Sequence, residues 1–209
     1  MLQPKKKPQL MWFQLMIKVA FILLFCANIC LANEQIKQIE ASLNNIKTME
    51  AKILQIDSKN DNANGLFYLS KPGKMRIEYK TKKSDIVMVA SKQMITYYDK
   101  ELDEVSHVPT STTPATILMQ EKINFDDFEI LSFDVDGNIY KIKFYQKGKK
   151  DEGIFVFTFK HDDTFILQRI DRFENENTTY RISILFTNIK INQEIPDKLF
   201  ILKDKRLFN

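Results

Sequence analysis

Two histidines, two acidic pairs and one acidic turn are the side chains that could support catalysis or metal binding. His107 and His161 are far apart, and neither has a partner at metal-ligand spacing, so no zinc site is predicted. Residues 134–138, Asp-Val-Asp-Gly-Asn, resemble the start of a calcium loop. However, Ile139 and Tyr145 stand where that loop needs Gly and Glu. We interpret this stretch as a hairpin turn.

The sequence also has no recognisable nucleophile or phosphate site. The acidic pairs, residues 126–127 and 162–163, are typical of solvated turns between strands. There is no Gly-x-Ser-x-Gly elbow and no phosphate-binding loop, and the chain has only five glycines. We therefore predict a protein that is not an enzyme and has no metal and no cofactor.

The positive charge of the chain is confined to its N-terminus. The whole chain carries a net charge of +4, but residues 33–209 contain 27 basic and 27 acidic residues. A neutral domain has no overall field to hold a polyanion, so nucleic acid is not an expected partner.

Residues 1–32 have the pattern of a secretory signal peptide. Lys5, Lys6, Lys7 and Lys18 precede an apolar run that ends in Cys30-Leu31-Ala32, and we predict cleavage after Ala32. Both cysteines lie in this segment, so the mature protein has no thiol. An uncleaved anchor over residues 10–31 is the alternative, although Lys18 at its centre would cost about 2.5–3.5 kcal/mol. A start at Met16 would give a more compact signal.

The remaining chain, residues 33–209, is predicted to be one domain made mostly of strands. Residues 34–48 carry apolar side chains at helical spacing, and residues 59–65 predict a turn. Strands are predicted at residues 49–57, 66–70, 75–80, 85–90, 94–99, 104–108, 128–135, 139–145, 154–160, 165–172 and 179–188. A loop and a short helix fill residues 109–124.

The fold class follows from the number of strands and from their alternation. Met75, Ile77 and Tyr79 alternate with charged residues, so one face is apolar and the other wet. A sheet of about eleven such strands must curve or be covered. We predict a mainly β (α+β) protein: an incomplete antiparallel β-barrel, or strongly curved sheet, with an N-terminal helix and short lid helices over a hydrophobic cavity. Periodicity alone cannot distinguish a cavity from a packed core.

Several segments resemble one family when they are taken in order. Residues 65–79 read Gly-Leu-Phe-Tyr-Leu-Ser-Lys-Pro-Gly-Lys-Met-Arg-Ile-Glu-Tyr, a strand that ends before a proline and is followed by another strand. This is similar to the signature of the outer-membrane lipoprotein carrier (LolA) family. Further similar segments are residues 86–99, 113–119, 169–171, 186–192 and 196–208. The resemblance extends over nearly the whole mature chain.

The resemblance implies a periplasmic lipoprotein chaperone. Proteins of this kind receive triacylated lipoproteins from an inner-membrane lipoprotein-releasing ABC transporter. They shield the acyl chains in a hydrophobic cavity and deliver them to the outer membrane, where an outer-membrane lipoprotein receptor can take part. We expect this chain to be a monomer that acts in the same way.

The resemblance also implies which residues bind the cargo. Met75, Ile77 and Tyr79 would face the cavity, as would Phe144 from a later strand. The underside of the lid would be formed by Ile117, Leu118 and Met119. Each of these apolar residues could equally be an ordinary core contact.

The chain departs from the family at the latch that holds the lid. The family has arginine before the proline, where it hydrogen-bonds lid-helix carbonyls, but here that position is Lys71. Lysine lacks the planar fork of donors that arginine offers. We predict that Lys71 is the latch, with Arg76 as the alternative.

Two other functions remain open from the sequence. One is a periplasmic protein that binds lipids or other hydrophobic ligands on the same fold. The other is an envelope-assembly interaction module with a filled core, which would have no apolar cavity. An enzyme is a distant third possibility, because no acid–base or nucleophilic pair is evident.

Overall fold

The computed structural model describes residues 32–81, 84–91, 94–110, 115–176 and 179–202. Of the predicted signal peptide, residues 1–32, residues 1–31 lie outside the described residues. The chain divides into two units, residues 1–38 and residues 39–209. A helix spans residues 32–45, so its last turns, residues 39–45, belong to the second unit. In the described parts of the chain, no helix is both long and apolar enough to cross a bilayer.

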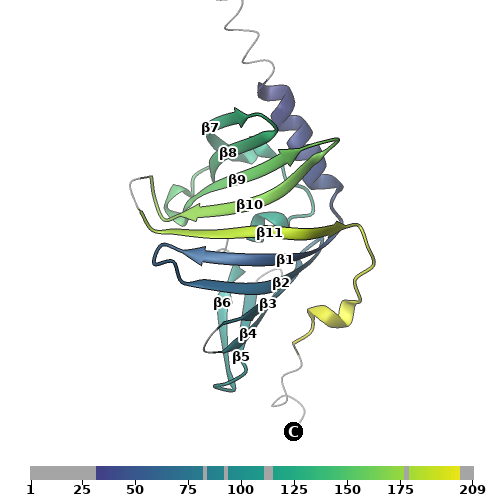
Figure 1. Ribbon diagram of the computed structural model, residues 1–209, viewed down its shortest axis with the longest axis vertical. Helices are drawn as coiled ribbons and strands as arrows, with labels where there is room; N and C mark the ends of the chain where they lie inside the picture. The colour runs from purple at the N-terminus through teal and green to yellow at the C-terminus, as the bar shows by residue number, and fades with distance from the viewer. Residues whose placement is uncertain (1–31, 82–83, 92–93, 111–114, 177–178, 203–209) are drawn as a thin grey trace, which may run out of the picture. The chain divides into compact units, whose positions relative to one another are not determined.

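Eleven antiparallel strands form one sheet in the second unit, in the order β6-β5-β4-β3-β2-β1-β11-β10-β9-β8-β7 (Figure 1). The strands are β1 Thr48–Asp57, β2 Asn62–Ser70, β3 Lys74–Lys80, β4 Asp85–Ala90, β5 Met94–Asp99, β6 Glu104–Pro109, β7 Phe128–Asp136, β8 Ile139–Gln146, β9 Ile154–His161, β10 Phe165–Phe173 and β11 Arg181–Ile191. The sheet curves but does not close, because β6 and β7 are its two edges. This confirms the predicted fold class.

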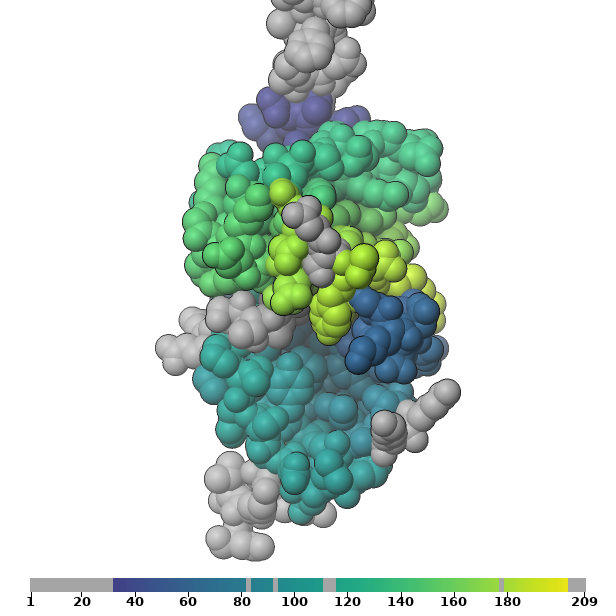
Figure 2. All heavy atoms as spheres, turned by 90° about the vertical axis from the view of Figure 1, so that its left-hand side faces the viewer, coloured from purple at the N-terminus to yellow at the C-terminus, as the bar shows by residue number. Residues whose placement is uncertain are grey.

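The two halves of the sheet are each built from neighbours in sequence. Strands β1–β6 and strands β7–β11 pair consecutively, and the ladder between β1 and β11 joins them. In Figure 2 the first half runs from blue to teal and the second from green to yellow-green, and the blue and yellow-green parts lie between the teal and green ones. The two-residue hairpin between β7 and β8 has positive φ only at its first central residue, Gly137 (φ 57°), as in a type II′ turn.

Short helical segments complete the second unit. They are α2 Ala115–Leu118, η2 Phe125–Asp127, η3 Lys150–Glu152 and η4 Asp197–Phe200. Asn124 caps η2, because its side chain accepts a hydrogen bond from the Asp126 backbone N–H. The helical segment 39–45 buries Ile39 and Leu43, at 0% and 2% exposure, so the apolar stripe seen in the sequence is a packing face.

Several predicted boundaries were wrong. The helix expected over residues 34–48 ends at Asn45, since β1 already begins at Thr48. The turn expected at residues 59–65 ends earlier, since β2 already begins at Asn62. Gly65 lies within that strand, where a Cβ would come within 2.6 Å of the Glu78 carbonyl oxygen. Glycine therefore permits the close approach of β2 and β3 at this position. The last strand runs from Arg181 to Ile191 rather than over residues 179–188.

Candidate functional site

The three β3 residues predicted to face a cavity lie together on the inner face of the sheet. Met75, Ile77 and Tyr79 are 0%, 2% and 8% exposed. The Tyr79 hydroxyl donates a hydrogen bond to Gln55 Oε1 at 2.7 Å. Burial raises the pKa of Tyr79 far above its ordinary value, so the phenol remains a protonated donor at physiological pH.

The predicted lid residues are also buried. Ile117, Leu118 and Met119, in and after α2, are between 2% and 6% exposed. The turn between β2 and β3 holds this segment, since the Gly73 N–H donates to the Met119 carbonyl at 2.8 Å. Residues 111–114 of the predicted lid lie outside the described residues.

Phe144 is surrounded by aromatic rings. Its ring centroid lies 5.0–5.9 Å from those of Phe125, Phe128, Phe155 and Phe157. Most of these contacts are edge-to-face, the favourable arrangement for a packed aromatic cluster. The structure therefore places Phe144 in a filled part of the interior. That it binds an acyl chain stays a prediction.

Lys71 has the geometry of a latch. It begins the turn that follows β2, and its Nζ donates a hydrogen bond to the Leu43 carbonyl oxygen at 2.9 Å. That carbonyl belongs to the last turn of the helix, where the helix dipole favours a cation. Burial, followed by repulsion from Lys47, lowers the pKa of Lys71 to about 8.

Arg76, the alternative latch, makes different contacts. Its Nε donates to Glu78 Oε1 at 2.6 Å, and its Nη1 donates to the Leu199 carbonyl at 3.1 Å. The second of these contacts attaches η4 to β3, a connection that the ion pair between Lys74 and Asp197 also makes. Arg76 thus ties down the C-terminal segment, whereas Lys71 contacts the helix carbonyl.

Two further side chains connect the helix to the lid segment and to η2, and neither was predicted from the sequence. Asn44 donates to the Ile123 carbonyl at 2.7 Å and accepts from the Ile123 N–H at 2.8 Å. Glu40 accepts a hydrogen bond from the Phe125 N–H at 2.7 Å. The available signal was Asn44 itself, since asparagine is unfavourable within a helix unless its amide finds a partner.

An apolar pocket of about 630 Å³ opens between the end of the helix and strands β10 and β11. Its buried lining is formed by Ile46, Met49, Phe165, Leu167 and Phe186. Its polar lining is formed by Ser42, Asn45, Thr164, Gln168, Thr187 and Asn188. The pocket is large enough for one drug-sized ligand. None of the seven predicted binding residues lines it.

The pocket exists because two neighbouring strands separate. The ladder between β10 and β11 runs only from Phe173↔Arg181 to Arg169↔Leu185. Beyond that pair, residues 165–167 of β10 pair with β9 alone, and residues 186–187 and 190–191 of β11 pair with β1 alone. Figure 1 shows β10 and β11 diverging toward the helix. The end of the helix covers this opening, and its residues Ser42 and Asn45 line the pocket, as does the next residue, Ile46.

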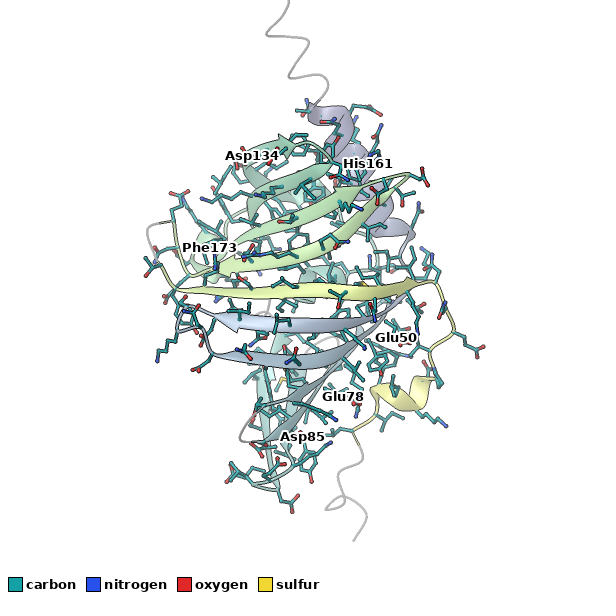
Figure 3. All side chains as sticks on the ribbon, viewed as in Figure 1. Glu50, Glu78, Asp85, Asp134, His161 and Phe173 are labelled. Atoms are coloured by element: carbon teal, nitrogen blue, oxygen red, sulfur yellow. The ribbon has the colours of Figure 1, made fainter. Side chains whose placement is uncertain are left out.

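The chemistry-bearing residues singled out in the sequence do not converge. Asp134 lies on β7 and His161 at the end of β9 (Figure 3). The His161 ring packs 4.3 Å from that of Phe165, and His107 on β6 contacts the Thr96 hydroxyl at 3.1 Å. Over the described ranges, no three His, Cys, Asp or Glu side chains are grouped so as to hold a metal ion.

Arg169 and Asp171 form the most organised polar cluster of the described residues. Arg169 Nε lies 2.9 and 2.8 Å from the two Asp171 carboxylate oxygens, and Ser183 Oγ donates to Asp171 at 2.5 Å. Asp171 is 6% exposed, so its charge is compensated where it is buried. This cluster ties β10 to β11 at the point where they still pair.

An open, curved antiparallel sheet with helical segments held over its inner face defines a class of half-barrel folds. The amino-acid sequence shows to which family of this class the chain belongs. The chain belongs to the outer membrane lipoprotein carrier protein LolA family, whose model matches residues 44–203.

Individual relatives are distant. An uncharacterized protein of Rickettsia prowazekii is 25% identical over 205 residues, which is 93% of this chain and 91% of the relative. An outer-membrane lipoprotein carrier protein of Methylococcus capsulatus is 26% identical over 172 residues, covering 78% and 80% of the two chains. A solved structure of an uncharacterized conserved protein from Thermus thermophilus shares the fold, with a TM-score of 0.52 at 11% identity over 82% of this chain and 93% of that one.

Proposed function

We propose that this protein is a periplasmic carrier that shields the acyl chains of lipoproteins on their way to the outer membrane. The observation that carries the proposal is the apolar pocket of about 630 Å³ beneath the helix end, in a chain of the lipoprotein carrier family. An acyl chain gains about 0.8 kcal/mol for each buried CH₂, so shielding a long chain amounts to roughly 10 kcal/mol.

The proposed carrier must open further to take a triacylated cargo. The pocket has the volume of a single ligand of moderate size. The inner face beneath α2 is filled by side chains such as Met75, Ile77 and Leu118. We infer that the helical segment 39–45 and the lid segment move away when further chains enter, which exposes this face to them. Methionine suits such a surface because its flexible thioether repacks around varied shapes.

Single hydrogen bonds between described residues hold the helix, the lid segment and η2 together, and such bonds can break and re-form. They include the Lys71–Leu43 bond, the two Asn44–Ile123 bonds, the Glu40–Phe125 bond and the Gly73–Met119 bond. Each contributes about 1 kcal/mol net, so the shielding of one chain outweighs the loss of several. We propose that an inner-membrane ABC transporter supplies this cargo and that an outer-membrane receptor or the bilayer accepts it.

A release assay tests the proposal. The protein, purified from the periplasm of expressing cells, would be added to spheroplasts that carry a labelled outer-membrane lipoprotein and a matched transporter. We expect label in the soluble fraction, in a one-to-one complex with the protein. Absence of soluble label with folded protein would refute the carrier function.

Two isoleucines provide a matched pair of variants for this assay. Ile166 lines the pocket and is 36% exposed, whereas Ile130 on β7 is 37% exposed and does not line it. Tryptophan at position 166 would fill the pocket mouth. We expect Ile166→Trp to reduce release and Ile130→Trp to leave it unchanged.

One observation favours a second function. The seven residues predicted to face a cavity are packed in the interior, with Phe144 among four other rings. This part of the interior is filled, as expected of an envelope-assembly interaction module, whereas the pocket between β10 and β11 is not. Such a module would co-purify without lipid and would fail the release assay while still binding a protein partner.

A further inference from the structure

The lining of the pocket between β10 and β11 contains no ionisable side chain. Its polar groups are the hydroxyls of Ser42, Thr164 and Thr187 and the amides of Asn45, Gln168 and Asn188. All six are neutral hydrogen-bonding groups. The site is therefore polar at its rim, apolar at its floor, and uncharged throughout.

Two β-bulges place amide side chains where the strands separate. On β10, Leu167 pairs with Phe159 and Arg169 with the next β9 residue, so Gln168 has no partner across the ladder. On β11, Thr187 and Lys190 pair with Lys52 and Glu50, so two β11 residues stand opposite one β1 residue.

The second bulge contains Asn188, whose φ is 51°. Asparagine tolerates this left-handed conformation better than most residues. Bulges often redirect side chains next to binding sites. Here both of them direct an amide to the lining of the same pocket. Among the described residues, neither side-chain amide has a hydrogen-bond partner, so both can serve a ligand.

Two cations that neighbour the lining on β10 and β11 are paired with carboxylates, and Lys47, which follows the lining residue Ile46, donates to the Asn44 carbonyl. Arg169 is bound to Asp171, with Nη2 and Oδ1 2.6 Å apart, and Lys190 lies 3.1 Å from Glu50. An anionic headgroup entering the pocket would therefore lose its water without gaining a counter-charge. That loss costs far more than burying a neutral carbonyl that receives a hydrogen bond.

We infer that this pocket selects acyl chains attached through an uncharged amide or ester, and rejects free fatty acids and other anionic lipids. Gln168 and Asn188 are the specificity-determining residues, since their amide groups hydrogen-bond the linkage. The inference rests on the proposed function, and it names the chemical class that the carrier accepts. An N-terminally acylated lipoprotein fits this class because both its amide-linked and its ester-linked chains are uncharged at the carbonyl.

Equilibrium dialysis with two soluble probes tests the inference. The probes are N-methyldodecanamide and dodecanoate, which share the same chain and differ in headgroup charge at pH 8. We expect the full protein to bind the amide at least tenfold more tightly. Equal affinity, or tighter binding of dodecanoate, would overturn the selectivity. Binding of neither probe would overturn the proposed carrier pocket together with the selectivity.

A charge substitution in the pocket sharpens the test. Gln168→Lys supplies the missing counter-charge, so it should tighten dodecanoate binding about tenfold and weaken amide binding. Gln146→Lys on β8, which does not line the pocket, is the matched control and should change neither affinity. An unchanged ratio in folded Gln168→Lys would overturn the role of Gln168. The wild-type comparison decides the selectivity even if this variant does not fold.

Discussion

Removing the Lys71 ammonium should loosen the end of the helix without unfolding the sheet. In Lys71→Leu the Leu43 carbonyl loses its charged donor at 2.9 Å and keeps only the Ile46 N–H at 3.3 Å. A hydrogen bond to a charged group contributes about 1.5–3 kcal/mol. The variant also recovers the cost of half-burying a cation, the cause that lowers the pKa of Lys71. The net loss should therefore be about 1 kcal/mol for local opening, which corresponds to a roughly fivefold increase in amide exchange.

Hydrogen exchange read by mass spectrometry measures this effect at the helix end. Faster exchange should appear in residues 39–47 and stay absent from β8 and β9. Lys147→Leu is the control, since Lys147 Nζ also donates to a backbone carbonyl, that of Asp126 at 2.8 Å, but away from the helix. If exchange at residues 39–47 and ligand release were both unchanged in Lys71→Leu, Lys71 would not be a latch.

Three further predictions concern stability, measured by urea unfolding. Asn44→Ala leaves both the Ile123 N–H and the Ile123 carbonyl without their side-chain partner, so we expect the free energy of unfolding to fall by about 2–3 kcal/mol. In the control Asn45→Ala, at an exposed position, it should fall by less than about 0.5 kcal/mol. Equal losses in the two variants would contradict the role of Asn44. Phe144→Ala opens a cavity in the aromatic cluster and should cost roughly 3–5 kcal/mol; a small loss would indicate that Phe144 lines an empty space. The pKa of Lys71 is lowered to about 8, so between pH 8 and its ordinary 10.5 the unfolded chain binds more protons and stability rises with pH. Lys71→Leu should lack this rise. A difference in stability between the two proteins that does not change with pH would show that the titration of Lys71 does not contribute to it.

The fold was predictable where a short pattern decides the structure. Met75-Arg76-Ile77-Glu78-Tyr79 alternates strictly, and the structure buries its three apolar residues. The eleven strands were found because apolar alternation and turn residues recur along the chain. Their ends were less accurate, as β2 shows, because a strand can continue through turn-forming residues when its neighbour pairs with them.

The site was less predictable because it depends on where strands stop pairing. Residues 179–188 looked like one regular strand, but the positive φ of Asn188 and the extra residue opposite β1 belong to tertiary structure. The Asn44–Ile123 contact joins residues 79 positions apart, which no local pattern reports. Phe144 illustrates a further limit, since alternation predicted its burial but could not say whether it faces a ligand or other rings.

The order of the strands has a consequence for how the chain folds during its synthesis. All eleven strands can pair locally in two meanders, β1–β6 and β7–β11, but the second edge of β1 Thr48–Asp57 must wait for β11 Arg181–Ile191. Chains emerge N-terminus first during synthesis. In the growing chain the second edge of β1 thus stays unpaired until β11 has been synthesised, and such edges invite wrong partners. The slow step of folding should be this single long-range ladder, whose formation requires both ends of the domain.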